Sequence, residues 1–425
     1  MFRVNVLGII TEYNPFHYGH LYHLQEAKKI SKANYTICII NGNFVQRGRP
    51  AFINKWARTM MALKNGVDLV IELPLIYGIR SAEYFANGSI QLLNATGLIS
   101  DFVFGSETGE IELLKEIAII LNKDNQYFNK RLQIYINKGY SYPRAREKAL
   151  INYLSTNNYD FKDEKVINII RQPNNILGIE YIKALLKSNS TITPHAIRRK
   201  GGEYHSLKTG RSIASASAIR KNIAENGLDS AEKLLLVNTM EILKREFSEG
   251  RAPLKEELLD NIVLAKLRAM PAGELQKYAE INDSLENRII QAANITGSLK
   301  AITDKIMTKA FTKTRIQRNL LHILFSLKEN DFATYDKEGP QYIRVLGVNK
   351  KGKELLSELS ENSSLPVIVK VSNYLRKKDI ESKNLIEKSL SYDLLASDIY
   401  SLLYPDKKQR KGHNDYSTPL IQIDY

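Results

Sequence analysis

Two histidines flank a glycine in His17-Tyr18-Gly19-His20, where an apolar run ends and an amphipathic run begins. These runs, residues 4–10 and 21–30, predict a strand followed by a helix. The first turn of a helix has unpaired backbone N–H groups and the positive end of the helix dipole, so it attracts phosphate. Imidazoles three residues apart lie on one face of that turn. We therefore predict that His17 and His20 are catalytic and contact the α-phosphate of a nucleoside triphosphate.

The H-x-G-H pattern also arises by chance, because only three of its four positions are fixed. Its place after the first predicted strand and at the start of a helix favours the catalytic interpretation. The neighbouring residues are then expected to contact the nucleotide: Ile10, Thr11, Glu12, Tyr13, Asn14, Pro15, Phe16, Gly19 and Leu21. His23 lies further into the helix, and we interpret it as a packing or surface residue.

A second helix start with hydroxyl and basic residues occurs at Ser215, Ser217 and Arg220. A serine there can cap the helix, and an ordinary capped, basic helix is the simpler interpretation. Together with the histidine pair, the segment favours binding of the β- and γ-phosphates, with Arg220 as a catalytic residue. Further expected nucleotide contacts are Gly105, Asn174, Asn175, Arg198 and Arg199. For Asn174 and Asn175, capping of the helix that begins there is at least as good an interpretation.

The loop after the second predicted strand, residues 41–50, contains donors that suit a carboxylate. An arginine can donate two hydrogen bonds to one carboxylate. We therefore place Asn43, Gln46 and Arg47 on the side of an acid or acceptor substrate, with a flexible surface loop as the alternative. Glu72, at the end of the third predicted strand, could face the site or a metal, although the sequence identifies no metal ligands.

Strand and helix signals alternate through the first part of the chain. This alternation predicts an α/β fold with a doubly wound parallel sheet. Ligands on such sheets bind at the carboxyl ends of the strands. Residues 1–225 would form this catalytic domain, with a helical insertion at 110–170. Residues 226–425 are predicted to be mostly helical, with β-like runs within 340–375, such as residues 365–371.

The 425 residues carry a formal net charge of +15. Lysine and arginine outnumber acids by nine to one at 183–221 and by six to one at 300–318. Such segments bind polyanions or form solvated helix faces, and charge alone does not decide between these. The sequence has no membrane-spanning run, no signal peptide, one cysteine, and no zinc or P-loop pattern. These features favour a cytoplasmic protein over membrane, secreted and zinc-dependent classes.

Several segments together resemble the tRNA(Met) cytidine acetate ligase family of the nucleotidyltransferase superfamily. They are residues 11–20, 42–48, 104–107, 173–178, 314–318 and 396–400. The first segment is highly specific, the last two are weaker, and together they span nearly the whole chain. Ser217 stands where a threonine is expected, which preserves the hydroxyl group.

The resemblance implies a Rossmann-like nucleotidyltransferase fold and a two-step reaction. Acetate would attack the α-phosphate of ATP, with Mg²⁺ bridging phosphates. The acetyl-adenylate would then acetylate N4 of the wobble cytidine of elongator tRNA(Met). The residues implied to hold the nucleotide are Gly105, Asn174 and Arg199. Those implied to hold the pyrophosphate are Ser215, Ser217 and Arg220. Those expected to bind the tRNA are Lys200, Lys313, Arg315 and Arg318. No obligate protein partner is implied.

Two other functions remain open from the sequence. A nucleotidyltransferase that adenylylates a small coenzyme precursor would share H-x-G-H, but it would not need the long basic C-terminal region. A non-catalytic RNA-binding protein on the same fold would keep the basic segments, but it need not retain both histidines. Release of pyrophosphate that depends on acetate would separate these functions.

Overall fold

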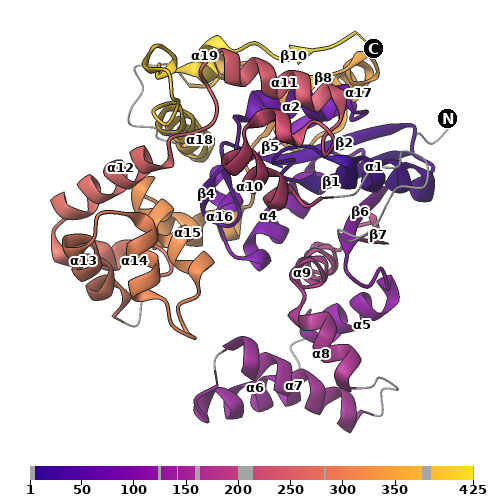
Figure 1. Ribbon diagram of the computed structural model, residues 1–425. Coiled ribbons are helices and arrows are strands. Elements are labelled where there is room, and N and C mark those ends of the chain that lie inside the picture. The colour runs from indigo at the N-terminus through magenta and orange to yellow at the C-terminus, as the bar shows by residue number, and fades with distance from the viewer. Residues whose placement is uncertain are drawn as a thin grey trace.

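The computed structural model describes residues 5–122, 126–140, 142–157, 163–199, 214–281, 284–375 and 384–424. Its centre is an eight-stranded sheet (Figure 1) with the order β10-β8-β5-β2-β1-β6-β7, in which β9 pairs with β8. The strands are β1 (Val6–Thr11), β2 (Tyr35–Asn41), β5 (Leu69–Leu73), β6 (Asp101–Ser106), β7 (Thr193–Arg198), β8 (Ile343–Val348), β9 (Val367–Ile368) and β10 (Ile421–Gln422). A separate hairpin of β3 (Phe44–Val45) and β4 (Arg49–Pro50) lies in the loop after β2.

Strand β1 lies at the switch point of the strand order. It pairs in parallel with β2 on one side and with β6 on the other. The chain therefore adds β2 and β5 in one direction and later adds β6 and β7 in the opposite direction. In such sheets a crevice opens at the carboxyl ends of the strands beside the switch point. The predicted α/β class with a doubly wound sheet is confirmed.

Both faces of the sheet carry apolar side chains. Successive side chains of a strand point to opposite faces, so each strand contributes to two cores. In β2, Ile37 and Ile39 join one core, whereas Cys38 and Ile40 join the other. The helices that pack on the Cys38 side are α1 (Tyr18–Ser31), α2 (Lys55–Lys64), α10 (Ala216–Asn226) and α11 (Val237–Ser248). Those on the Ile37 side include α3 (Leu75–Gly78), α4 (Ala82–Ala95), α9 (Pro173–Lys187), α17 (Lys350–Asn362) and α18 (Leu385–Ser401).

Two groups of helices extend away from the sheet (Figure 1). The first group is α5 (Ile111–Asn122), α6 (Gln126–Asn137), α7 (Tyr142–Thr156) and α8 (Asp163–Arg171). The second is α12 (Glu256–Ala269), α13 (Leu285–Ile295), α14 (Leu299–Ile306) and α15 (Lys313–Leu324), followed by α16 (Glu329–Glu338). Among the described residues, no helix combines the length and apolar character needed to cross a membrane.

Strand β8 changes one detail of the expected organisation. All of its residues are buried, and it runs antiparallel to β5, while β10 runs parallel to β8. The sheet is therefore mixed rather than wholly parallel, and the C-terminal region contributes to its core. The β-like runs expected within 340–375 include this strand, but its antiparallel pairing with β5 joins residues far apart in the sequence, so the sequence alone did not predict it. The domain boundary at residue 225 stays a prediction.

A buried cluster of charges joins the C-terminal region to the first half of the sheet. Lys55 Nζ lies 2.8 Å from Glu72 Oε1 and 2.5 Å from Asp415 Oδ1. Arg344 of β8 pairs with both acids, at 3.1 Å from Glu72 Oε2. Burial alone would raise the pKa of Asp415, but Lys55 and Arg344 lower it. The expectation that Glu72 faces the site or a metal is wrong, because its carboxylate is fully used by these two cations.

Replacing one acid of this cluster should destabilise the protein strongly. We expect Glu72→Gln to lower the free energy of unfolding by about 3–5 kcal/mol, because it leaves buried cations without compensation. Urea unfolding of the purified variant measures this loss. Glu112→Gln breaks an exposed pair with Lys115 and should change stability by less than about 0.5 kcal/mol. Equal effects of the two changes would contradict a structural role for the cluster.

Candidate active site

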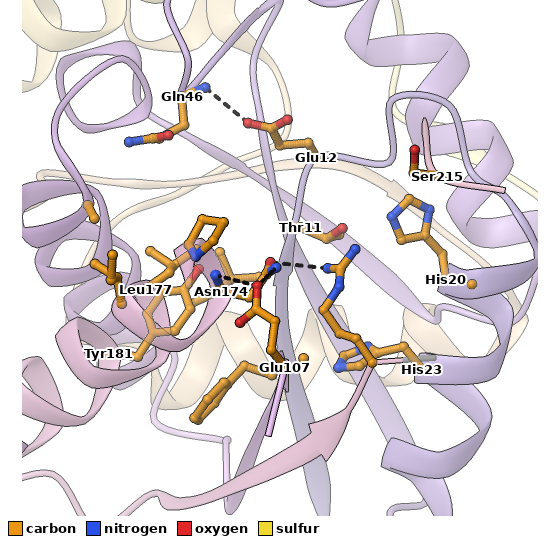
Figure 2. Close-up of a pocket in the computed structure, with 18 of the residues that line it drawn as sticks. Thr11, Glu12, His20, His23, Gln46, Glu107, Asn174, Leu177, Tyr181 and Ser215 are labelled. Carbon is orange, nitrogen blue, oxygen red and sulfur yellow. Dashed lines mark hydrogen bonds between the residues drawn. The ribbon is translucent and has the colours of Figure 1, made fainter. Parts of the chain in front are cut away.

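A pocket of about 920 Å³ opens at the carboxyl ends of β1, β6 and β7 (Figure 2). The loop after β1, the start of α1 and the loop after β6 line it, as the strand order predicts. Its predicted lining residues are Ile10, Thr11, Glu12, His17, Gly19, His20, Gln46, Arg47, Gly105, Asn174, Arg198, Arg199, Ser215 and Arg318. The fold thus brings residues between Ile10 and Arg318, far apart in the sequence, around the H-x-G-H turn.

The first turn of α1 fixes the orientation of both histidines. His17 is the N-cap residue, and its Nδ1 accepts a hydrogen bond from the Gly19 backbone N–H at 3.0 Å. The Nδ1 of His20 accepts from the His17 backbone N–H at 3.3 Å. In a neutral imidazole, the nitrogen that accepts a hydrogen bond has no proton, so the other nitrogen carries it. Both rings therefore present Nε2–H as the remaining donor.

Burial keeps these two rings uncharged. It lowers the pKa of His17 to about 4, with further lowering by Arg199 and Arg220. It lowers the pKa of His20 well below its usual value, and His17 and Arg199 add to the effect. The rings are stacked, with centroids 3.9 Å apart. At neutral pH the turn thus presents two neutral donors to an incoming phosphate, and no charged imidazolium has to be buried.

Arg220 and Ser215 approach the turn from the start of α10. The Arg220 guanidinium donates to the Asn14 carbonyl at 2.6 Å, directly before the H-x-G-H turn. Ser215 is the N-cap residue and accepts from the Ala218 N–H at 3.2 Å. The predicted cap therefore exists, and Ser215 also lines the pocket. Ser217 hydrogen-bonds with the Ser215 hydroxyl at 3.1 Å but does not line the pocket.

The start of α9 is capped by a residue that the sequence did not indicate. The Glu107 carboxylate accepts from the backbone N–H groups of Asn174 and Asn175 at 3.1 and 2.8 Å. The alternative that Asn174 or Asn175 is the N-cap is wrong, because Gln172 occupies that position without a side-chain bond. Asn174 instead accepts from Arg199 Nη1 at 3.1 Å, which holds Arg199 over the pocket. Figure 2 shows Asn174 and Glu107 side by side.

Asn175 supports the site from behind rather than lining it. It is fully buried, and its Oδ1 accepts from the Ser106 hydroxyl at 2.7 Å and the Glu107 N–H at 3.0 Å. Four residues of the β1–α1 loop and one residue of α1 also lie outside the pocket lining: Tyr13, Asn14, Pro15, Phe16 and Leu21. Tyr13 and Phe16 pack against the His20 ring at 5.0 and 5.6 Å between centroids. The expected nucleotide contacts of these residues stay predictions.

The loop after β2 reaches the pocket with two of its three predicted residues. Asn43 is buried, accepting from the Lys55 N–H at 2.7 Å and donating to the Ser397 hydroxyl at 3.2 Å. Its expected place on the acid side is wrong, because these bonds direct it toward α2 and α18. Gln46 donates its backbone N–H to Glu12 at 3.0 Å and its side-chain amide to the Arg80 carbonyl at 2.8 Å. Figure 2 shows the Glu12–Gln46 contact.

His23 is a pocket residue that sequence reasoning missed. It lies in the pocket wall beside Gly105 and Arg199, whereas the sequence predicts a packing or surface residue. Its Nε2 is buried and has no hydrogen-bond partner among the described residues. Its spacing from His20 is the signal that could have found it, because residues three apart share a helix face. The pocket also contains Thr314, whereas Lys200 lies outside the described residues.

The low pKa of His17 predicts how stability depends on pH. An unfolded histidine takes up a proton near pH 6.5, but folded His17 does so only near pH 4. Stability should therefore fall as the pH drops from 6.5 to 4, by up to about 3 kcal/mol from this residue. Replacing it by asparagine, His17→Asn, keeps an N-cap acceptor and removes the titration. Urea unfolding at both ends of this range should show a shallower loss for His17→Asn, and equal losses would contradict a neutral His17.

Comparisons with known proteins identify the family of this chain. Residues 4–415 match the model of the family described as HIGH Nucleotidyl Transferase. A tRNA(Met) cytidine acetate ligase of Halothermothrix orenii is 54% identical over 98% of this chain and 99% of its own length. That of Fervidobacterium nodosum is 41% identical over 99% and 100%. The crystal structure of Thermotoga maritima TmcAL bound with alpha-thio ATP is 37% identical, covers 99% of this chain and 100% of its own, and has a TM-score of 0.92. The chain therefore belongs to the tRNA(Met) cytidine acetate ligase family of the HIGH nucleotidyl transferases.

Proposed function

We propose that the protein uses ATP to activate acetate as acetyl-adenylate and then acetylates N4 of the wobble cytidine of elongator tRNA(Met). The observation that carries this proposal is the pair of neutral Nε2–H donors at the N-terminus of α1. Relatives with the printed name tRNA(Met) cytidine acetate ligase cover the whole chain. A close structural match binds an ATP analogue. We place the reaction in the cytoplasm, where tRNA is available.

The first step needs stabilisation of charge on the α-phosphate. A carboxylate oxygen of acetate attacks the α-phosphorus, and the bond to the β-phosphate oxygen breaks, so that pyrophosphate leaves and no proton is transferred. Negative charge on the non-bridging α-phosphate oxygens is stabilised by preorganised donors. His17 and His20 supply such donors without prior protonation. Arg199 and Asn174 would hold the nucleotide, while Arg220 and Ser215 would hold the departing pyrophosphate.

Mg²⁺ would enter with the nucleotide. No group of three or more histidine, cysteine, aspartate or glutamate side chains could hold a metal among the described residues. Of the two acids in the pocket, Glu107 caps α9 and Glu12 accepts from Gln46. Because Mg²⁺ commonly takes its ligands from substrate phosphates and water, this pocket fits an ion carried by the triphosphate. When bound, it would neutralise phosphate charge.

The second step brings an RNA base into the same pocket. The N4 amine attacks the acetyl carbonyl, which releases AMP and a proton, and the cytidine must be unstacked to reach it. Lys313 is exposed at the start of α15, and Arg315 lies in the same turn. We propose that these residues contact the tRNA backbone beside the pocket. Lys200 keeps the same proposed role, outside the described residues.

The first step can be tested without tRNA. We expect exchange of pyrophosphate into ATP that requires acetate, because reversal of adenylation regenerates ATP. His20→Ala should lower the exchange rate by about 10²- to 10³-fold, the loss seen when one preorganised donor is removed. Its affinity for tRNA should stay unchanged, because the ring lies inside the pocket.

A histidine of β7 that lies outside the pocket lining gives the control. His195 pairs with Asp101 at 2.7 Å and does not line the pocket, so His195→Gln should retain exchange. Acetate-independent exchange, or transfer of AMP to a coenzyme precursor, would favour a coenzyme adenylyltransferase. Absence of exchange with or without tRNA would favour a non-catalytic RNA-binding protein.

A further inference from the structure

Arg318 is a buried cation whose guanidinium lacks a full set of partners. Its side chain lies in the pocket wall, and the residue is only 9% exposed. Its Nε has no hydrogen-bond partner within the described part of the chain. Arginine stays protonated in proteins, and a buried charge without a partner is costly. Such a residue is suited to a bound anion, and its burial does not suit the role we expected for it, which was to track a tRNA backbone.

The other arginines that line the pocket differ from Arg318. Arg47, Arg198 and Arg199 are exposed, and Arg199 is bonded to Asn174. Arg80, near the same wall, is already paired with Asp336 and lies over the rings of Tyr84 and Phe332. Among the pocket arginines of the described chain, Arg318 alone is buried. It therefore gains most from an anion that enters the pocket.

Helix α15 packs closely against the loop that follows β2. These contacts fix the position of Arg318. Gly48 has a φ of +78°, and a Cβ there would lie 2.5 Å from the Arg318 backbone nitrogen. With its amide oriented to satisfy both neighbours, Gln317 donates to the Arg47 carbonyl at 3.3 Å and accepts from Arg49 at 3.0 Å. Thr314, one turn before Arg318, also lines the pocket. The positive end of the α15 dipole therefore faces the same space.

This anion position is separate from the one that suits the leaving phosphates. Arg318 lies on α15 against Gly48 in the loop after β2, whereas Ser215 and Arg220 lie at the start of α10. Gln46 belongs to the same loop as Gly48, which contacts the Arg318 backbone. Figure 2 shows Gln46 and Ser215 on opposite sides of Glu12. Because attacking and leaving oxygens lie roughly in line in phosphoryl transfer, the acid should approach from the side opposite to Ser215.

We propose that Arg318 binds the carboxylate of the acid substrate and orients one carboxylate oxygen toward the α-phosphate. This inference rests on the proposed adenylation of a small acid. It assigns a substrate role to a residue of α15, in the helical group beyond the sheet. It also moves the main carboxylate contact from exposed Arg47 to buried Arg318.

The test compares acid, nucleotide and tRNA binding in one variant. Arg318→Gln should raise the KM for acetate in ATP–pyrophosphate exchange by about tenfold to a hundredfold, the range for one lost charge-assisted hydrogen bond. The Kd for ATP without acid, measured by calorimetry, and the Kd for tRNA should stay near wild-type values. Lys337→Gln removes an exposed charge from α16 and should leave all three unchanged.

Each other outcome overturns the proposal in a different way. An equal rise in the Kd for ATP would assign Arg318 to the phosphates, and loss of tRNA affinity alone would assign it to the RNA. An unchanged acetate KM would remove it from the site. If Arg318→Gln does not fold, Arg318→Lys keeps the charge but not the planar fork, and it should show a smaller rise in acetate KM. If wild-type protein shows no acid-dependent exchange, the proposed function fails instead.

Discussion

Two backbone N–H groups in the first turn of α1 decide what His17 and His20 can do. Each N–H binds one ring at Nδ1, so each ring keeps its proton on Nε2. Burial keeps both rings neutral, which avoids the cost of two adjacent positive charges. The rest of the pocket depends on this arrangement, because the donors are set before the nucleotide arrives. Preorganised donors of this kind need no rearrangement in the transition state.

The fold holds that turn in place from several directions. Tyr13 and Phe16 pack against the His20 ring, and Arg220 holds the carbonyl of Asn14 before it. At the other end of the sheet, the Lys55 cluster joins β5 to β8 through buried ion pairs. Helix α15 then presses Arg318 against Gly48. The C-terminal region thus contributes both to the sheet and to the pocket wall, in addition to its proposed contact with tRNA.

Sequence reasoning identified the features that depend on neighbouring residues. The strand, turn and helix around His17 and the Ser215 cap both follow from local patterns. The sequence-based predictions failed for side chains whose partners lie far away in the sequence. The residues around Asn43 and Glu72 do not indicate that both bind Lys55. The residues around Arg318 do not indicate that its side chain is buried. The capping role of Glu107 is not visible in the sequence, because its partners on α9 lie more than 60 residues away. The roles of the site residues stay predictions.

The protonation state of the paired histidines is the central claim, and ¹⁵N NMR of histidine-labelled protein tests it directly. Spectra of the nucleotide-free protein should show an unprotonated Nδ1 and a protonated Nε2 for both His17 and His20 between about pH 5 and pH 8. Assignment by His17→Asn and His20→Ala would separate the two rings. Imidazolium signals, or protons on Nδ1, in that range would contradict the account of the site.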